Sequence, residues 1–370
     1  MKYLAILMIY STSVFAAAPQ FTLGTRSSYF FDDNKLANSF LYAQTEYSYE
    51  NYDNEMGLKL NFDIRAMDYY SSNEKTIVDP VNLSAEFLLD SHRFQIGFVR
   101  YRFSETFGLQ LLDIANPRDY SEFIFNDLSW AKRSVFGMNH TVKYNRLETQ
   151  FILTLWPNGD RLPYKGSPFN EDGFIEGGVV ERPWFKNPEY GVRTKYLFES
   201  GLDLSLLYFH HFARSTPGLN EQVDSFGLAF SYVHNEWVLR GDNLYTLSDF
   251  VQPTFLQVEE KNHFQSLWGI DRVWENFTLG LQVQFDFNLY RHYAGGQFEY
   301  SAFDVWKPAI MVFKNIKRED YWLQVKNRFS IGDFNINLTY DSFGGEKTDK
   351  DLFGHFSSHD RFLIDVSASF

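Results

Sequence analysis

Residues 277–289 read Phe277-Thr278-Leu279-Gly280-Leu281-Gln282-Val283-Gln284-Phe285-Asp286-Phe287-Asn288-Leu289, and this stretch decides the fold class. Every odd-numbered residue in it is apolar, whereas the even-numbered residues are polar or glycine. Because successive side chains of a β-strand point to opposite faces, this period of two predicts a strand with one apolar and one polar face. Residues 58–66 (LKLNFDIRA) and 334–341 (FNINLTYD) alternate in the same way, and weaker alternation continues from Gln20 to the C-terminus.

The 370-residue chain is rich in aromatic residues but hydrophilic on average. It contains 39 Phe, 23 Tyr and 8 Trp, with a mean hydropathy of −0.33 and 22% charged residues. After the first twenty residues no apolar run reaches the ~18 residues of a transmembrane helix, so a polytopic helical membrane protein is excluded, as is a disordered chain. The lack of cysteine excludes disulfides and thiolate metal sites, and the net charge of −13 argues against a general nucleic-acid-binding protein. A soluble β protein and an outer-membrane β-barrel both remain.

The N-terminus has the three parts of a secretory signal peptide. Met1-Lys2 provides a short positive start, residues 3–10 are mainly apolar, and residues 11–18 are mainly small and end in Ala16-Ala17-Ala18. The apolar part is too short to span a bilayer. We therefore expect a signal peptide over residues 1–18, with cleavage after Ala16 or Ala18, followed by a single barrel domain over residues 19–370.

Three further features favour the outer-membrane barrel. The strand-like runs span about ten residues, the length that a tilted strand needs to cross a bilayer. Short polar turns such as Asn145-Arg146 and Gly332-Asp333 alternate with longer connections, as expected when turns face the periplasm and loops face outward. Aromatic residues gather at strand ends, for example at Tyr29-Phe30-Phe31 and Tyr321-Trp322, where they would form girdles at the membrane interfaces. An ordinary aromatic core is the alternative explanation of these clusters.

The C-terminal strand-like segment carries Phe362, Ile364, Val366 and Ala368 on one face and ends in Phe370. Here the chain resembles Gram-negative outer-membrane proteins, whose final strand commonly ends in an aromatic residue that the barrel-assembly machinery recognises. The resemblance implies an all-β fold, a transmembrane antiparallel up-and-down β-barrel, with Phe370 as its assembly signal. It also implies that the protein resides in the cell outer membrane.

The number of strands should be even if both ends of the chain lie in the periplasm. About sixteen or seventeen candidate strands can be drawn, so we predict about 16, with about 14 or about 18 as the alternatives. The uncertain region runs from Arg291 to Arg318, where Pro308 interrupts the alternation and one strand or two can be placed.

The stretch from Arg100 to Asp119 departs from the strand rhythm. It contains Asp113-Ile114-Ala115-Asn116-Pro117-Arg118-Asp119, which resembles the Asp-x-x-Asn-Pro-x-Asp loop motif of a poorly characterised family of porin-like Gram-negative barrels. The resemblance covers residues 96–122 and includes a later loop over residues 161–169. Phe103-Ser104 stands where the family has Trp-Gly, and Phe98 stands where an Arg is usual.

This loop has two interpretations. Pro117 fixes its own φ and favours an extended Asn116, so the pair predicts a turn. In one interpretation the loop folds into the lumen and narrows it, with charged and polar residues near the solute path. In the other, the loop forms a salt-bridge network with the wall that only holds its shape. Both interpretations concern the same candidates: Arg102, Asp113, Asn116, Arg118 and Asp119.

If the apolar strand faces meet lipid, the opposite faces line the interior. These polar faces carry both signs of charge, and rings of charge set the ion preference of a pore. The pore-lining candidates on the strands are Lys59, Asp63, Arg65, Arg193, Lys195, Asp286, Lys326 and Arg328.

These features predict a porin-like channel for the passive passage of small solutes, with no cofactor and no metal site. The expected partners are outer-membrane lipid, the barrel-assembly machinery and an unidentified small solute, with no nucleic acid; by analogy with porins, a homotrimer is expected. A barrel for transport or export of hydrophobic solutes is one alternative, and apolar luminal residues with a lateral opening would indicate it. A barrel enzyme is the other. Against it, the adjacent His210 and His211 should point to opposite faces, and residues 357–360 (SSHD) cannot converge if they are extended.

Overall fold

The computed structural model describes residues 15–16, 18–31, 35–52, 56–69, 76–106, 109–122, 128–164, 167–170, 178–182, 185–216, 219–254, 257–289, 291–301, 303–346 and 351–370. Most of the expected signal peptide, residues 1–14 and 17, lies outside these ranges. No helix in the described ranges is long and apolar enough to cross a membrane.

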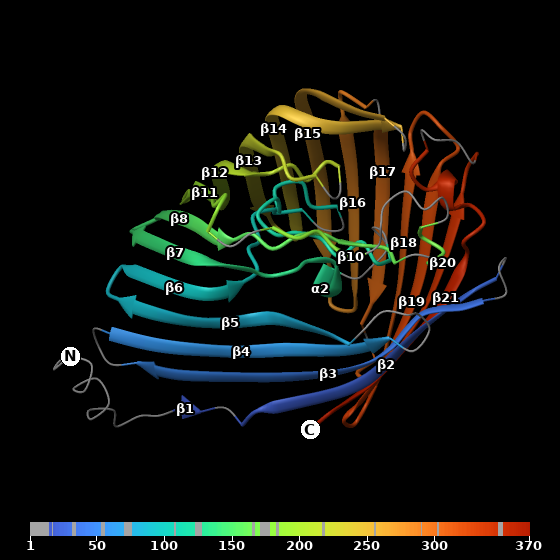
Figure 1. Cartoon of the computed structure of the whole chain (residues 1–370), viewed down its shortest axis with the longest axis horizontal. Coiled ribbons are helices and arrows are strands. Elements are labelled where there is room, and N and C mark those ends of the chain that lie inside the picture. Colours follow the sequence, from blue (N-terminus) through green and yellow to red (C-terminus); the bar gives the residue numbers. More distant parts are fainter. Residues whose placement is uncertain are drawn as a thin grey trace.

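Eighteen strands form a closed antiparallel barrel in which strands that follow one another in sequence are paired (Figure 1). The bounds of these strands are β2 Gln20–Phe30, β3 Lys35–Tyr52, β4 Met56–Tyr69, β5 Ile77–Leu89, β6 His92–Val99, β7 Val135–Tyr144, β8 Leu147–Trp156, β11 Glu189–Leu197, β12 Leu202–Phe212, β13 Gln222–His234, β14 Trp237–Thr254, β15 Gln257–Val273, β16 Phe277–Asp286, β17 Arg291–Tyr300, β18 Trp306–Asn315, β19 Tyr321–Ile331, β20 Phe334–Gly344 and β21 Arg361–Ser369. The first and last of them close the ring, because β2 pairs with β21 from Thr22–Ser369 to Phe30–Arg361.

Several short elements are not members of this ring of strands. β1 (Phe15–Ala16) pairs with the end of β3, and β9 (Arg161–Leu162) pairs with β10 (Gly178–Val179). Helix α2 covers Leu128–Ala131, and the 3₁₀ helix η1 covers Gly354–Phe356.

The predicted fold class is confirmed, but the preferred count of about sixteen strands is wrong. The uncertain region contains two strands, β17 and β18, and Pro308 lies inside β18. Pro308 pairs with Asn327 of β19, whereas the pairing of β17 with β18 ends at Glu299 and Ala309. Proline cannot donate a ladder hydrogen bond and is tolerated where one side of a strand has no partner. The β17 side of β18 provides such a position, so Pro308 does not end the strand.

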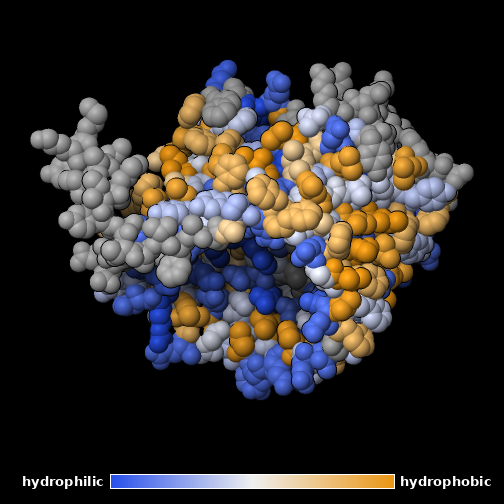
Figure 2. All heavy atoms as spheres, turned by 90° about the horizontal axis from the view of Figure 1, so that it is seen from below, coloured by the Kyte–Doolittle hydropathy of each residue, from blue (hydrophilic) through white to orange (hydrophobic). Residues whose placement is uncertain are grey.

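The strand faces divide as the alternation predicts. In β16, Leu281 is exposed on the outer surface, while Gln282 and Asp286 are buried on the inner side. In Figure 2, hydrophilic side chains surround a hollow in the lower face of the barrel, and hydrophobic side chains cover much of the outer wall beside it. The barrel therefore has an apolar exterior and a largely polar interior.

The two ends of the barrel differ in their connections. The end that holds both termini of the barrel also holds the short turns between β5 and β6, β7 and β8, and β13 and β14. Asp90, Asn145 and Asn235 in these turns have φ values of 50, 52 and 53°. Two-residue hairpins require such positive φ values, which Asn and Asp tolerate better than most residues. The longer connections lie at the opposite end, which confirms the predicted asymmetry.

Two of the longer connections fold into the barrel. Residues 100–134 join β6 to β7, and residues 157–188 join β8 to β11. In Figure 1 parts of both, including α2 and β10, lie inside the ring of strands. Apolar residues of the first connection, among them Phe103, Leu112 and Ile114, form one buried cluster with inward-facing residues of β12–β15. We call residues 100–134 the first inserted loop and residues 157–188 the second inserted loop.

Candidate functional site: the lumen and its inserted loops

The motif residues of the first inserted loop hold its backbone in place. The Asp113 carboxylate accepts hydrogen bonds from the backbone N–H groups of Phe103 (2.5 Å) and Ser104 (2.9 Å), and it also pairs with Lys132. Burial lowers the pKa of Lys132, although the negative charge of Asp113 opposes this shift. Because Asp113 is only 2% exposed, it can support the loop but has little surface to offer a passing solute.

Asn116 bridges the two ends of the same loop. Its side-chain oxygen accepts a hydrogen bond from the Tyr101 N–H (2.7 Å), and its side-chain nitrogen donates to the Arg133 carbonyl (2.8 Å). This residue is 1% exposed. An amide suits the position because it can accept a hydrogen bond from one end of the loop and donate one to the other end at the same time.

Arg161 ties the two inserted loops to each other and to the wall. Its guanidinium donates to Asp119 of the first loop (2.5 Å) and to Asp79 of β5 (2.8 Å). Burial alone would lower the pKa of Arg161, but the carboxylates of Asp119 and Asp79 more than offset this effect and raise it. The Asp119–Arg161–Asp79 cluster is therefore a charged junction that has been removed from solvent.

The second inserted loop carries another buried cation, Arg182. Its guanidinium lies 4.2 Å from the ring centre of Phe212 and donates to the carbonyls of Asn158 and Leu219, both at 3.0 Å. Burial and then the nearby positive charge of Arg214 lower the pKa of Arg182 to about 10. Arg182 thus fastens this loop to the end of β12 and to the connection that follows it.

On one side of the barrel, Glu105 anchors the first inserted loop to the wall. Its carboxylate contacts Arg193 (3.4 Å) and Lys195 (3.3 Å) of β11. Its backbone N–H donates to Asp242 of β14 (3.1 Å), which also accepts a 2.7 Å hydrogen bond from the Thr106 hydroxyl. The predicted candidates Arg193 and Lys195 therefore attach the first inserted loop to the wall.

On the other side, the anchors are Trp130 and Glu122. The guanidinium groups of Arg26 in β2 and Arg65 in β4 lie 4.6 and 3.7 Å from the ring centre of Trp130, within cation–π range. The Glu122 carboxylate accepts a 2.9 Å hydrogen bond from Arg361 of β21. The loop therefore spans the lumen and is attached to opposite walls.

The other predicted residues lie on the inner wall or on the loop surface. Lys59 pairs with Glu50 at 2.5 Å, Asp63 accepts a 2.8 Å hydrogen bond from Gln44, and Arg328 pairs with Glu299 at 2.8 Å. Lys326 is partly exposed, and Arg118 is partly exposed on the first inserted loop. Arg102 differs from the buried motif residues because its side chain is exposed.

Sequence reasoning missed several anchoring residues. Arg26 and Arg361 could have been found, because each lies on the polar face of an alternating strand. Glu105 and Trp130 could not, since no periodic pattern assigns a direction to a residue in an irregular loop. The tertiary contacts alone identify them as anchors.

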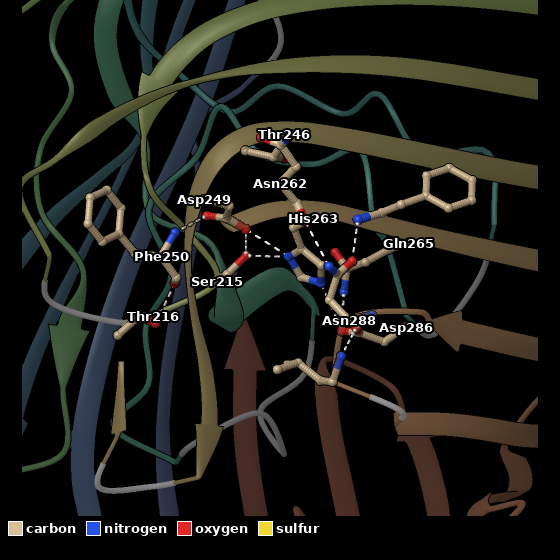
Figure 3. Close-up of polar contacts among 12 residues, drawn as sticks. Ser215, Thr216, Thr246, Asp249, Phe250, Asn262, His263, Gln265, Asp286 and Asn288 are labelled. Carbon is tan, nitrogen blue, oxygen red and sulfur yellow. Dashed lines mark hydrogen bonds and ion pairs between the residues drawn. The ribbon is translucent and has the colours of Figure 1, made fainter. Parts of the chain in front are cut away.

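A further buried cluster surrounds His263 of β15, close to the loop end of the barrel (Figure 3). Its Nδ1 lies 2.8 Å from Asp249 of β14, and its Nε2 lies 3.0 Å from Asp286 of β16. The predicted candidate Asp286 therefore binds His263 of the neighbouring strand β15. Gln265 also donates to Asp286, and Ser215 donates to Asp249 at 2.5 Å. With a carboxylate at each ring nitrogen, the imidazole can donate two hydrogen bonds only as the imidazolium cation.

The His263 cluster contains the residue types of a serine–histidine–aspartate triad but not its geometry. Ser215 Oγ lies 3.4 Å from His263 Nδ1, but that nitrogen already faces Asp249 at 2.8 Å. A general base needs a free lone pair toward the nucleophile. Here Asp249 is the partner of this nitrogen and also accepts the hydrogen bond of the Ser215 hydroxyl. The cluster therefore links three strands and a loop rather than activating a nucleophile.

Of the two expectations for the candidate catalytic histidines, the structure confirms one and contradicts the other. His210 and His211 do point to opposite faces: His210 contacts Asp224, and the buried His211 contacts Ser225 on the inner side. The expectation that residues 357–360 are extended is wrong, because this segment follows η1 in a turn and brings Ser358 Oγ within 3.2 Å of His359 Nδ1. Asp360 bonds to Tyr340, Ser342 and Phe343 instead. Ser358, His359 and Asp360 therefore do not form a catalytic relay.

Comparison with solved structures identifies proteins of the same fold. OccD3 of Pseudomonas aeruginosa is 11% identical, with a TM-score of 0.60 over 97% of this chain and 92% of that one. OccAB1 of Acinetobacter baumannii is 9% identical, with a TM-score of 0.59 over 98% and 97%. OmpF of Salmonella typhi, solved in complex with daunomycin, is 10% identical, with a TM-score of 0.51 over 95% and 97%. No family model and no curated protein matches the chain. At these identities the likeness shows a shared fold.

Proposed function

We propose that the protein is a porin-like channel of the Gram-negative outer membrane, through which small solutes pass without chemistry or energy coupling. The main observation behind this proposal is a closed barrel that is apolar outside and polar inside. A loop crosses its lumen and is attached by charged contacts to the walls on both sides. An apolar exterior suits lipid, and an inserted loop narrows a water-filled interior. The similar folds are those of outer-membrane channels, which supports the same assignment.

We infer different roles for the candidate residues. Asp113, Asn116 and Asp119 shape the loop, and their burial supports the scaffolding interpretation for these three. Arg102 is exposed on the same loop and carries the positive charge that we assign to the constriction. The strand residues Lys59, Asp63, Lys326 and Arg328 would form the charged lining of the wall.

The proposal includes a route to the membrane. A signal peptide over residues 1–18 would direct export, the barrel-assembly machinery would recognise the terminal Phe370, and three copies would associate as in other porins. A non-enzymatic role follows from the proposal, and the occupied nitrogens of His263 support it. Transport of hydrophobic solutes through the wall is less well supported, because every described barrel strand is paired with both neighbours.

Single-channel recording in planar bilayers tests the proposal. The refolded protein should give discrete, voltage-independent conductance steps. Replacing Arg102 by glutamate should shift the ratio of anion to cation permeability toward cations severalfold, because it reverses the charge that we assign to the constriction. Arg146→Glu is the matched control, since Arg146 lies in a short turn and pairs with the exposed Glu199. A protein without conductance steps would contradict the channel, and equal selectivity of both variants would contradict the role of Arg102.

A further inference from the structure

A hydrogen-bonded polar group lies on the outward face of the wall at β14 and β15. Asn243 and Ser266 are cross-strand partners there, and Trp268 lies two residues further along β15. Their chain neighbours Asp242, Leu244 and Leu267 face inward, where Asp242 binds the first inserted loop and both leucines belong to its buried cluster. Because side chains alternate along a strand, Asn243, Ser266 and Trp268 must face the exterior.

This group lies at the level of the apolar band. Asn243 is also paired with Leu228 of β13, and the amide and charged or imidazole side chains on the outward face of β13 lie only toward its ends, at Gln222 and Asp224 and at His234. Asn243 is therefore paired near the middle of the nine residues, 225–233, that separate these two rims. At this depth no water is present to satisfy a polar group, so an unpaired amide is strongly unfavourable there.

The hydrogen bonds of the group leave one end of the Asn243 amide free. The indole N–H of Trp268 donates to Ser266 Oγ (2.8 Å), and Ser266 Oγ donates to Asn243 Oδ1 (2.8 Å). In the described part of the chain, the other amide atom of Asn243 has no hydrogen-bonding partner. If the amide were turned over, its oxygen would be the free atom, so one polar atom faces outward in either orientation.

The outward residues around Asn243 are a small serine, a glycine covered by an aromatic ring and an exposed tryptophan. Gly241 is the next outward residue on β14, and the Phe230 ring lies over it and packs edge-on against Trp268 with 5.3 Å between the ring centres. Ser266 is small and 5% exposed. Small residues beside a polar side chain are typical of protein contacts inside membranes. Trp268, which is 49% exposed, provides apolar contact area next to them.

We propose that Asn243 lies at the symmetry axis of the homo-oligomer, where its amide meets the Asn243 amides of the other copies of this chain. An amide both donates and accepts, so identical amides around an axis satisfy one another without a second residue type. In a symmetric assembly a residue meets its own copy only at the axis, which defines β13–β15 as the contact face. This inference rests on the membrane placement in the proposed function.

Cysteine crosslinking tests the contact, and the chain has no native cysteine to interfere. Full-length Asn243→Cys, oxidised in native outer membranes, should form a disulfide-linked product of twice the chain mass in most of the protein. Ile364→Cys is the matched control, because Ile364 is a partly exposed outward residue on β21, on a different part of the wall. The control should give at least tenfold less product.

A second variant keeps the test independent of disulfide geometry. Asn243→Leu replaces the amide by an apolar side chain of similar size, so the barrel should fold normally but appear as the monomer in mild detergent, where the natural protein stays oligomeric. The proposal is overturned if Asn243→Cys crosslinks no better than Ile364→Cys, if its product has a mass other than twice the chain, or if Asn243→Leu keeps the natural oligomeric state. Heat-dependent gel mobility of the monomer reports the barrel separately, and its loss would contradict the proposed function instead.

Discussion

At the scale of single residues, buried charges determine how the inserted loops sit. Arg161 and Arg361 are both 1% exposed, and each lies between two carboxylates: Asp79 and Asp119 for Arg161, and Asp341 and Glu122 for Arg361. A buried ion cluster of this kind contributes little net stability compared with apolar packing, but breaking it leaves an uncompensated charge. The clusters therefore act mainly to define one position for each loop.

Replacement of Arg161 by leucine should destabilise the protein by roughly 3–5 kcal/mol, because the buried Asp119 carboxylate would lose its ion pair with Arg161 and Asp79 would keep only its 3.5 Å contact with Arg133. Urea unfolding in detergent, followed by gel mobility, measures the change. Arg328→Leu provides the comparison: its pair with Glu299 is exposed, and such pairs contribute only about 0–1 kcal/mol. Equal effects of the two substitutions would contradict the role assigned to the Asp119–Arg161–Asp79 cluster.

At the scale of elements, the alternation of each strand separates lipid-facing from lumen-facing residues. Leu338 lies mid-strand in β20, between Asn327 of β19 and Ile364 of β21, and Asn337 faces the other way. Leu338→Arg should therefore destabilise the barrel by roughly 2–4 kcal/mol, because it places a charge in hydrocarbon, whereas Asn337→Ser should change stability little. Refolding into lipid vesicles at increasing urea concentration measures both. Equal tolerance of the two substitutions would show that the facing assignment of β20 is wrong.

The same alternation explains how much of the structure could be predicted. The fold class, the two faces of β4, β16 and β20 and the inward direction of Lys59, Asp63 and Arg65 follow from local sequence alone. The partners of the loop residues do not, because Glu105 and Arg193 are 88 positions apart and meet only when the barrel closes.

The His263 cluster shows a second limit of the sequence pattern. The register between β14 and β15 shifts between Thr246 and Asp249, where Ser248 has a φ of 48°. Strict alternation from Thr246, which faces inward, would turn Asp249 outward. The extra residue of the bulge returns Asp249 to the inner side, where it reaches His263. A bulge of this kind has no period, so the pattern could not reveal it.

At the scale of the whole molecule, closure of the barrel depends on the pairing of β2 with β21, and Phe370 lies at the end of that pairing. Its N–H donates to the Phe21 carbonyl at 2.8 Å and its carbonyl accepts from the Phe21 N–H at 3.2 Å, while its side chain is 70% exposed. The backbone of Phe370 therefore takes part in closure, whereas the exposed ring contributes little to packing. If this ring is an assembly signal, its effect must be exerted before the barrel is complete.

Phe370→Ala should therefore impair assembly of the barrel in cells but leave the stability of the folded barrel nearly unchanged. The unfolding free energy of the refolded barrel should change by no more than about 0.5 kcal/mol, as for other exposed positions, because the backbone pairing with Phe21 remains. The amount of folded protein that reaches the outer membrane of expressing cells should fall severalfold. Phe334→Ala is the matched control, since Phe334 is 55% exposed at the same end of the barrel but is internal to the chain. Equal yields of the two variants in the membrane would exclude a signalling role for Phe370, and a large loss of refolded stability would make its role structural.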